Sequence, residues 1–99
     1  MQFFALDNFA GLVNQTFEVA LGDVGNTAFV LVEARPLQPS ESLPGQVRAP
    51  FSLLFRHEAA IVFPQKTYPM QHEALGEFGI FLVPIARDRT GFIYQALFN

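Results

Sequence analysis

The chain has 99 residues, of which 51% are hydrophobic and 15% are charged, and its formal net charge is −3. A length of this order predicts one domain, residues 1–99, with a single core. The six basic residues are scattered along the chain, so no basic stripe is available to follow a phosphate backbone, and we expect no nucleic-acid partner. Zero cysteines exclude disulfides and cysteine-ligated zinc, and they fit a cytoplasmic protein.

The surface is short of charge. Soluble domains average roughly 25% charged residues, and the deficit here favours a protein partner or self-association. Twelve phenylalanines and no tryptophan supply aromatic material of the kind that fills cores. The opening "MQFFALDNFAGLV" has no basic segment and is too short to span a bilayer, so we expect a mature cytoplasmic sequence and no membrane partner.

The first elements are a short helix and a hairpin. In "ALDNFAGLVNQ" the apolar residues recur at helical spacing, which predicts a helix over residues 7–14 with Asp7 capping its first amides. "TFEVAL" alternates strictly and is typical of a half-buried strand. "GDVGN" has the composition of a hairpin connection to "AFVLVEAR", so the first hairpin runs from about Thr16 to Arg35. The residues expected to face inward on its first strand are Phe17, Val19 and Leu21.

The middle of the chain alternates loops and short strands. Residues 36–50 contain four prolines, which predicts a surface loop. "FSLLFR" resumes the alternation, and "HEAAIVFPQ" crosses over with Pro64 limiting any strand. "TYPMQH" is interpreted as a short strand at a sheet edge, because Pro69 has no N–H to donate. The residues expected to face inward in "FSLLFR" are Phe51, Leu53 and Phe55.

The last fifth of the chain, "FGIFLVPIARDRTGFIYQALFN", predicts a second hairpin. Asp88 and Gly91 stand at the first and fourth positions of a type I turn followed by a left-handed residue, a three-residue loop. In that register Asp88 closes on Phe92, and Val83 lies opposite Leu97.

Both faces of this hairpin are apolar. One carries Phe78, Ile80, Leu82, Tyr94, Ala96 and Phe98. The other carries Phe81, Val83, Ile85, Ile93 and Leu97, together with Arg87 and Gln95. Leaving such side chains in water forgoes several kcal/mol at about 25 cal/mol per Å². We therefore expect either the N-terminal helix or another subunit to cover the second face, and its five apolar residues are the predicted interface.

The polar residues indicate no chemistry. His57 and His72 are each followed by a glutamate, but neighbouring residues on a strand point to opposite faces, so no metal site is expected. In "RDR" the simplest interpretation is that Asp88 starts the turn and the arginines solvate it. Arg56 could form a core ion pair with Glu33 or Glu77, although a surface arginine at a strand end is favoured. Without a phosphate loop or a nucleophile elbow, we expect neither an enzyme nor a cofactor.

A resemblance adds to this interpretation. The runs "VEARPL", "PFSLLFR" and "FPQKTYPMQHEALGEFGIFLVPIARDRTGFIYQALFN" resemble an uncharacterised family of small bacterial proteins, a domain of unknown function. The likeness covers nearly the whole chain, from "DNFAGLVNQTF" to the terminal "ALFN". It implies no residue role. Relatives encoded near phage-tail-like collar proteins imply an assembly or accessory role.

The predicted fold is all-β, a six-stranded antiparallel sandwich or partly open barrel with one short N-terminal helix; the alternative is an α+β sheet covered on one face by that helix. The predicted function is a non-enzymatic structural or protein-interaction module, accessory to a phage-tail-like assembly. The alternative is a β-barrel that binds a small apolar ligand, which requires an internal cavity.

Overall fold

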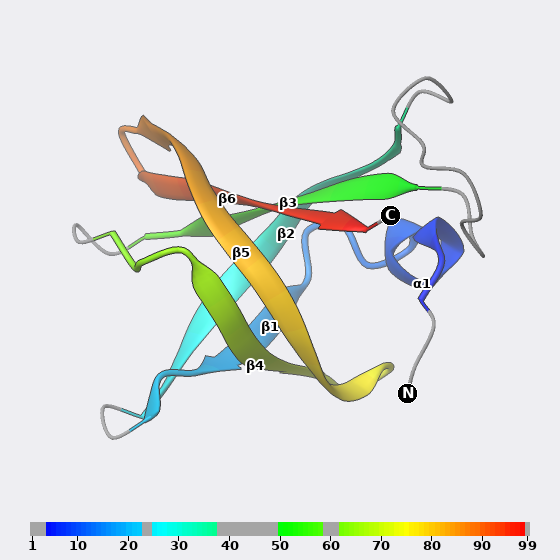
Figure 1. Ribbon diagram of the computed structural model, residues 1–99, viewed down its shortest axis with the longest axis horizontal. Coiled ribbons are helices and arrows are strands. Elements are labelled where there is room, and N and C mark those ends of the chain that lie inside the picture. The colour runs from blue at the N-terminus through cyan, green and yellow to red at the C-terminus, as the bar shows by residue number, and fades with distance from the viewer. Residues whose placement is uncertain (1–3, 23–24, 38–49, 59–61, 99) are drawn as a thin grey trace.

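The protein folds as a closed six-stranded antiparallel barrel with a short N-terminal helix (Figure 1). The computed structural model describes residues 4–22, 25–37, 50–58 and 62–98. The strands follow one another around the barrel in the order β1-β2-β3-β6-β5-β4. This confirms the predicted all-β fold of six antiparallel strands with one short N-terminal helix, and the barrel is closed where the sequence predicted a sandwich or a partly open barrel. The elements are α1 (Leu6–Ala10), β1 (Thr16–Ala20), β2 (Asn26–Pro36), β3 (Phe51–His57), β4 (Lys66–His72), β5 (Gly76–Asp88) and β6 (Gly91–Phe98).

Alternation along the strands builds the barrel core. The predicted first hairpin is confirmed, with Thr16 paired to Val30 and Ala20 to Asn26. Inward positions are filled by large apolar side chains, and most outward positions outside β5 and β6 carry polar or shorter ones. The predicted inward residues Phe17, Val19, Phe51, Leu53 and Phe55 are all fully buried. The predicted inward face of the second hairpin is also confirmed: Ile80, Leu82, Tyr94 and Ala96 are buried, and Phe78 and Phe98 pack against the core.

Strand β4 is not a sheet edge, contrary to the sequence prediction. It pairs along its whole length with β5, and it also pairs with β1 through Val19 to Met70 and Glu18 to Gln71. Those two pairs close the barrel. The ladder to β1 involves only the residues after Pro69, so the proline limits this pairing without preventing it.

Aromatic side chains close the two ends of the barrel. At one end α1 inserts Phe9, which is fully buried against Phe17, Phe51 and Phe98. At the other end the crossover from β3 to β4 places Phe63 against the barrel mouth, where its backbone N–H donates to the Tyr94 hydroxyl. The helix therefore closes an end of the barrel and does not cover the outer face of β5 and β6 (Figure 1).

The helix is shorter than predicted. It spans Leu6–Ala10 in place of residues 7–14, and the following residues form turns in which the Asn14 N–H donates to the Leu31 carbonyl of β2. Capping by Asp7 is also wrong. The Asn8 side chain accepts a hydrogen bond from the Ala5 N–H at 2.7 Å, because an Asn at the third helical position can reach back to the residue before the helix.

The register of the second hairpin differs from the prediction. Asp88 pairs with Gly91 and not Phe92, which leaves a two-residue loop and shifts the register by one residue, and a bulge at Ile85 shifts it by one more, so that Val83 lies opposite Gln95 in place of Leu97. A bulge adds one residue to one strand and shifts every pair beyond it. Its second effect is to move Arg87 off the outer face: Arg87 pairs with Phe92, and its guanidinium lies 5.7 Å from that ring.

The predicted surface loop at residues 36–50 falls largely outside the described residues, which omit 38–49. Pro36 is the last residue of β2, and Pro50 precedes β3 with its carbonyl accepting from the Leu37 N–H. The described helix is too short to cross a bilayer.

Gly91 is predicted to be essential for stability. Its φ is 146°, and a Cβ at this position would collide with the His57 carbonyl oxygen of β3. We expect Gly91→Ala to lower the free energy of unfolding by about 2–4 kcal/mol in urea denaturation at fixed protein concentration. The control is Gly11→Ala, where φ is −83° and the added methyl meets open space. Equal stability of the two variants would contradict this close approach of β6 to β3.

Candidate functional site

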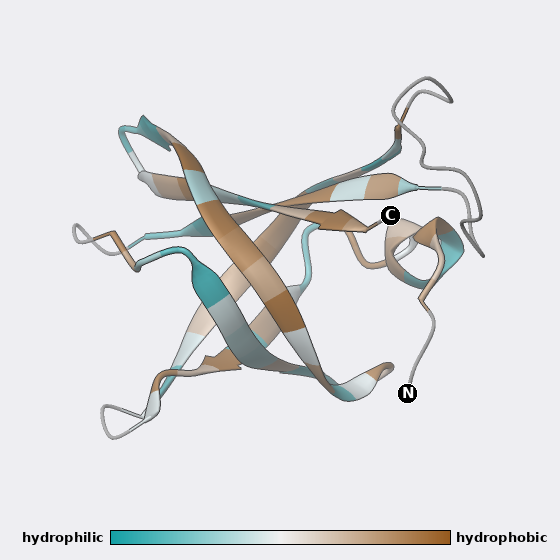
Figure 2. Ribbon diagram, viewed as in Figure 1, coloured by the Kyte–Doolittle hydropathy of each residue, from teal (hydrophilic) through white to brown (hydrophobic). Residues whose placement is uncertain are grey.

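The outer face of β5 and β6 carries exposed apolar side chains. Phe81 and Ile85 are each 49% exposed and Leu97 is 55% exposed, while Val83 and Ile93 are partly buried between neighbouring strands. Figure 2 shows the middle of β5 in brown and the β5–β6 turn in teal. All five residues of the predicted interface thus lie on these two strands with their side chains outside the core, and no described helix covers them. We call this set the apolar face.

The apolar face continues onto β3. Leu54 pairs with Gln95, which in turn pairs with Val83, so the three side chains form one row across β3, β6 and β5. Gln95 also donates from Nε2 to the Ser52 hydroxyl at 3.3 Å, which gives the buried Ser52 a partner. Sequence reasoning missed Leu54. The signal was present in "FSLLFR", because an apolar residue stands at the outward position between two inward ones.

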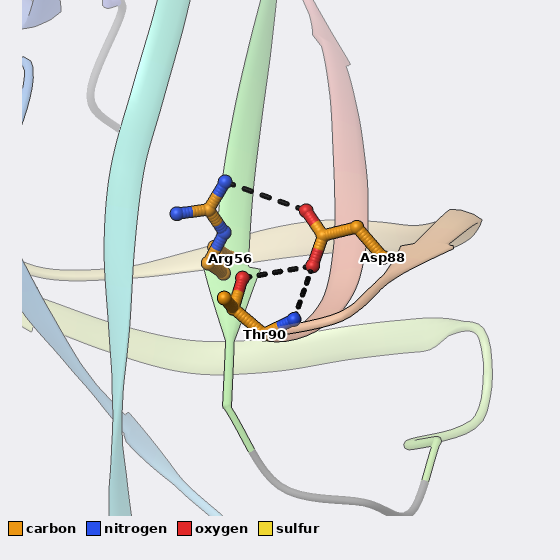
Figure 3. A network of polar contacts seen from close by, with 3 residues as sticks. All are labelled: Arg56, Asp88 and Thr90. Atoms are coloured by element: carbon orange, nitrogen blue, oxygen red, sulfur yellow. Dashed lines mark hydrogen bonds and ion pairs between the residues drawn. The ribbon is translucent and has the colours of Figure 1, made fainter.

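An ion pair borders the apolar face at the β5–β6 turn (Figure 3). Arg56 Nη2 lies 3.5 Å from Asp88 Oδ2, with both side chains partly exposed. The other carboxylate oxygen accepts hydrogen bonds from the Thr90 N–H and hydroxyl, each at 2.8 Å. These Thr90 hydrogen bonds, with Arg56 adding a smaller effect, lower the pKa of Asp88. Asp88 therefore starts the turn as predicted, and Arg56 is a surface arginine whose partner is neither Glu33 nor Glu77.

A shallow trough crosses the outer wall where β1, β4 and β5 meet. Its floor is formed by short or compact residues, since Pro69 pairs with Gly79 and Ala20 lies beside them on β1. Its two hollows measure about 260 and 360 Å³ and share Pro69 and Glu77. The trough could not be anticipated from the sequence, because its residues come together only through the pairing of three strands.

One wall of this trough is acidic. Glu18 pairs with Gln71 and Gln71 pairs with Glu77, so two carboxylates flank an amide in one row across the strands. The opposite wall is formed by Thr67, whose partner on β5 is Phe81 of the apolar face. The trough therefore adjoins the apolar face and adds negative charge at its edge.

The two histidines have structural partners. His57 is buried, its Nε2 is hydrogen bonded to the Thr27 hydroxyl, and its ring packs on Phe29 and Phe63. His72 Nε2 donates to Gln15 Oε1 at 2.8 Å, and its Nδ1 accepts from the Ala74 N–H. Within the described ranges no group of three His, Cys, Asp or Glu side chains is placed to hold a metal ion.

A hollow of about 560 Å³ lies beside His57 on the outer wall. It is lined by Thr27, Ala28, Val30, Arg56, His57 and Glu58. Its one arginine is engaged by Asp88, and the Glu58 carboxylate adds negative charge. In this hollow the Thr27 hydroxyl and His57 Nε2 are hydrogen bonded to each other, and the hollow offers no uncompensated cation. Of the described surfaces, the apolar face with its adjoining trough is the candidate binding site.

The chain belongs to the family DUF6916, described as a domain of unknown function, whose model matches residues 4–98. Neither the curated proteins nor the solved structures contain a match to this chain.

The buried His57 predicts a pH dependence of stability. Burial lowers the pKa of His57 from its usual 6.5, and the nearby Glu58 carboxylate opposes this only partly. Below pH 6.5 the unfolded chain therefore binds more protons than the folded one. Stability should be full above this pH and should fall as the pH decreases through the lowered pKa, in urea unfolding measured from about pH 7.5 to about pH 5.5.

The control for this prediction is His57→Gln, because an amide can still bond to the Thr27 hydroxyl but does not titrate in this range. The variant should lose the His57 part of the slope. An unchanged slope would assign the pH dependence to other groups.

Proposed function

We propose that the protein is a non-enzymatic structural or protein-interaction module that self-associates through the apolar face. The observation that carries the proposal is the exposure of three large apolar side chains, Phe81, Ile85 and Leu97, on the outer face of two paired strands of a closed barrel. Contiguous exposed apolar residues bordered by polar ones are characteristic of protein-binding surfaces. Here the border is formed by the Arg56–Asp88 pair and the acidic trough.

The expected affinity is modest. Half of the surface of three large side chains is roughly 250–300 Å². Burying that area on both copies contributes roughly 12–15 kcal/mol at about 25 cal/mol per Å². Association costs about 4–15 kcal/mol in lost freedom of motion. The two terms are of similar size, so the apolar contact alone leaves a small net free energy, and a micromolar dimer, which requires about 8 kcal/mol, needs further contacts.

A second copy of this chain is the occupant that the charge distribution favours. The five residues of the apolar face and the adjoining Leu54 and Gln95 are uncharged. At the border of the face Asp88 is paired with Arg56. A face without net charge at its centre does not repel its own copy, and isologous pairing about a two-fold axis is the commonest way for a homo-oligomer to bury such a surface.

The alternative function, a barrel that binds a small apolar ligand, requires space inside the barrel. The inward positions of the strands are filled by buried side chains, among them Phe17, Phe29, Phe55, Tyr68 and Tyr94. The hydroxyls of both tyrosines are used to fix the crossover that closes one end. This packing supports an interaction module over a ligand-binding barrel.

The resemblance of the sequence adds a narrower proposal, an accessory role in a bacterial phage-tail-like assembly. Components of a larger assembly bind one another through their outer surfaces, and the apolar face is such a surface. A barrel whose ends are packed is suited to a structural role without a ligand. The proposal of self-association does not depend on this narrower role.

Self-association is tested with Leu97→Asp. A charge at this exposed position should leave the fold intact and disrupt a dry contact, because burying an unpaired carboxylate is costly. We expect the wild type to sediment as a dimer at micromolar concentration and Leu97→Asp as a monomer with an unchanged circular dichroism spectrum. The matched control is Val62→Asp, since Val62 is 51% exposed but lies on the crossover between β3 and β4.

The outcomes separate clearly. A wild type that sediments as an 11.0 kDa monomer contradicts self-association. If both aspartate variants remain dimeric, the contact lies on another surface and the assignment to the apolar face is wrong.

A further inference from the structure

The outer surface along β5 changes in chemical character from one end to the other. At its start Glu77 belongs to the acidic wall of the trough. Its middle carries Phe81, Val83 and Ile85 of the apolar face. At its end the β5–β6 turn carries the exposed Arg89, while Arg87 is exposed on the other side of the strand, over the Phe92 ring. The strand thus presents an acidic, an apolar and a basic region in succession.

The acidic end is shaped to receive a side chain. Pro69, Gly79 and Ala20 form a floor without long side chains, so the trough is open above them. Glu18 and Glu77 stand along one wall and are exposed, and Phe81 adjoins the other. Among the described residues, the ion pairs are Arg35 with Glu33 and Arg56 with Asp88, so neither wall carboxylate has a cationic partner there. An arginine side chain fits this arrangement, with its stem over the floor and its guanidinium at the carboxylates.

The basic end presents uncompensated charge. Asp88 stands between the two arginines, but its carboxylate is already engaged by Arg56 and by Thr90 (Figure 3). Arg87 lies over the Phe92 ring with its side chain exposed, and Arg89 lies in the turn itself. The turn extends beyond the barrel at the far end of β5 from the trough (Figure 1).

These two ends cannot meet within one molecule. Glu77 and Arg87 are ten residues apart on one strand, which is about 33 Å in extended backbone. They stand at equal separations on either side of Leu82, the middle residue of β5. A two-fold axis passing near Leu82 and Val83 would therefore place the start of one β5 against the end of the other, with Phe81 and Ile85 close to the axis.

We propose that two copies of this chain pair with their β5 strands antiparallel, so that Arg89 of each copy enters the acidic trough of the other, with Arg87 beside it adding positive charge to the turn. The proposal rests on the self-association proposed above and specifies its geometry. The apolar centre supplies most of the buried area, and the charged ends fix the orientation, because any parallel arrangement would oppose like charges. The further contacts that the apolar face needs are thereby supplied at both ends.

Charge reversal tests this geometry. One variant is Glu18→Arg/Glu77→Arg, which makes both ends basic, and the other is Arg87→Glu/Arg89→Glu, which makes both ends acidic. All four positions are exposed, so both variants should fold. Each alone should self-associate about tenfold or more weakly than wild type, because every end-to-end contact is then repulsive. Mixed in equal amounts, the two variants should form a heterodimer at wild-type affinity, since each trough meets a turn of opposite charge.

The mixture is the decisive measurement, and rescue also demonstrates that both variants are folded. Circular dichroism shows whether each reversal variant is folded. If one of them unfolds, the milder single variants Glu77→Gln and Arg89→Gln take its place, and each of these two should weaken self-association. Failure of the folded variants to pair in the mixture overturns the proposed geometry. Reversal variants that dimerise as well as wild type, while Leu97→Asp is monomeric, also overturn it and leave the apolar contact standing. A monomeric wild type overturns both proposals.

Discussion

Closing the two ends of the barrel is the constraint on which the rest of the structure depends. A small barrel of six strands has an interior that its own inward side chains fill, but its ends are open to water unless another segment covers them. Phe9 from α1 covers one end and Phe63 from the crossover covers the other. Both described non-strand segments with large aromatic side chains are used in this way. The outer face of β5 and β6 is therefore left without a described cover from its own chain, and this is why its apolar residues imply a partner.

The bulge at Ile85 determines what the outer surface presents. Before it, Val83 points outward beside Gln95. Beyond it the alternation is shifted by one residue, so Arg87 lies with Phe92 and Asp88 turns outward to Arg56. Without the extra residue, Arg87 would stand on the apolar face, as strict alternation predicts. A charge in the middle of a contact surface would oppose its burial. The bulge thus separates an uncharged centre from a charged end along a single strand.

The sequence predicts those parts of the fold that depend on local patterns. The alternation in "TFEVAL" and "FSLLFR" is strong enough to assign the inward residues of β1 and β3, and Asp88 identifies the turn through the bonds that its side chain makes. The errors occur where distant segments decide the outcome. Pro69 indicates an edge locally, yet pairing of Met70 with Val19 closes the barrel. The helix ends at Ala10, and after it the chain turns so that the Asn14 N–H bonds to the Leu31 carbonyl of β2, a contact that no local pattern predicts. For the candidate site, the five apolar residues could be selected from alternation alone, whereas the trough depends on the pairing of three strands that no local pattern reveals.

The strand order also constrains how the protein folds. The hairpins β1–β2, β4–β5 and β5–β6 join neighbours in the sequence, but β3 pairs with β6 and β1 with β4 across long intervening segments. Such non-local pairings form slowly, because the entropy of closing a long loop is lost before the contact is gained. Until β6 has docked on β3, the C-terminal hairpin exposes apolar side chains on both of its faces, including the inward set of Ile80, Leu82 and Tyr94. The same strand pair that offers a binding surface in the finished barrel is thus the segment most exposed to aggregation while the chain is still folding.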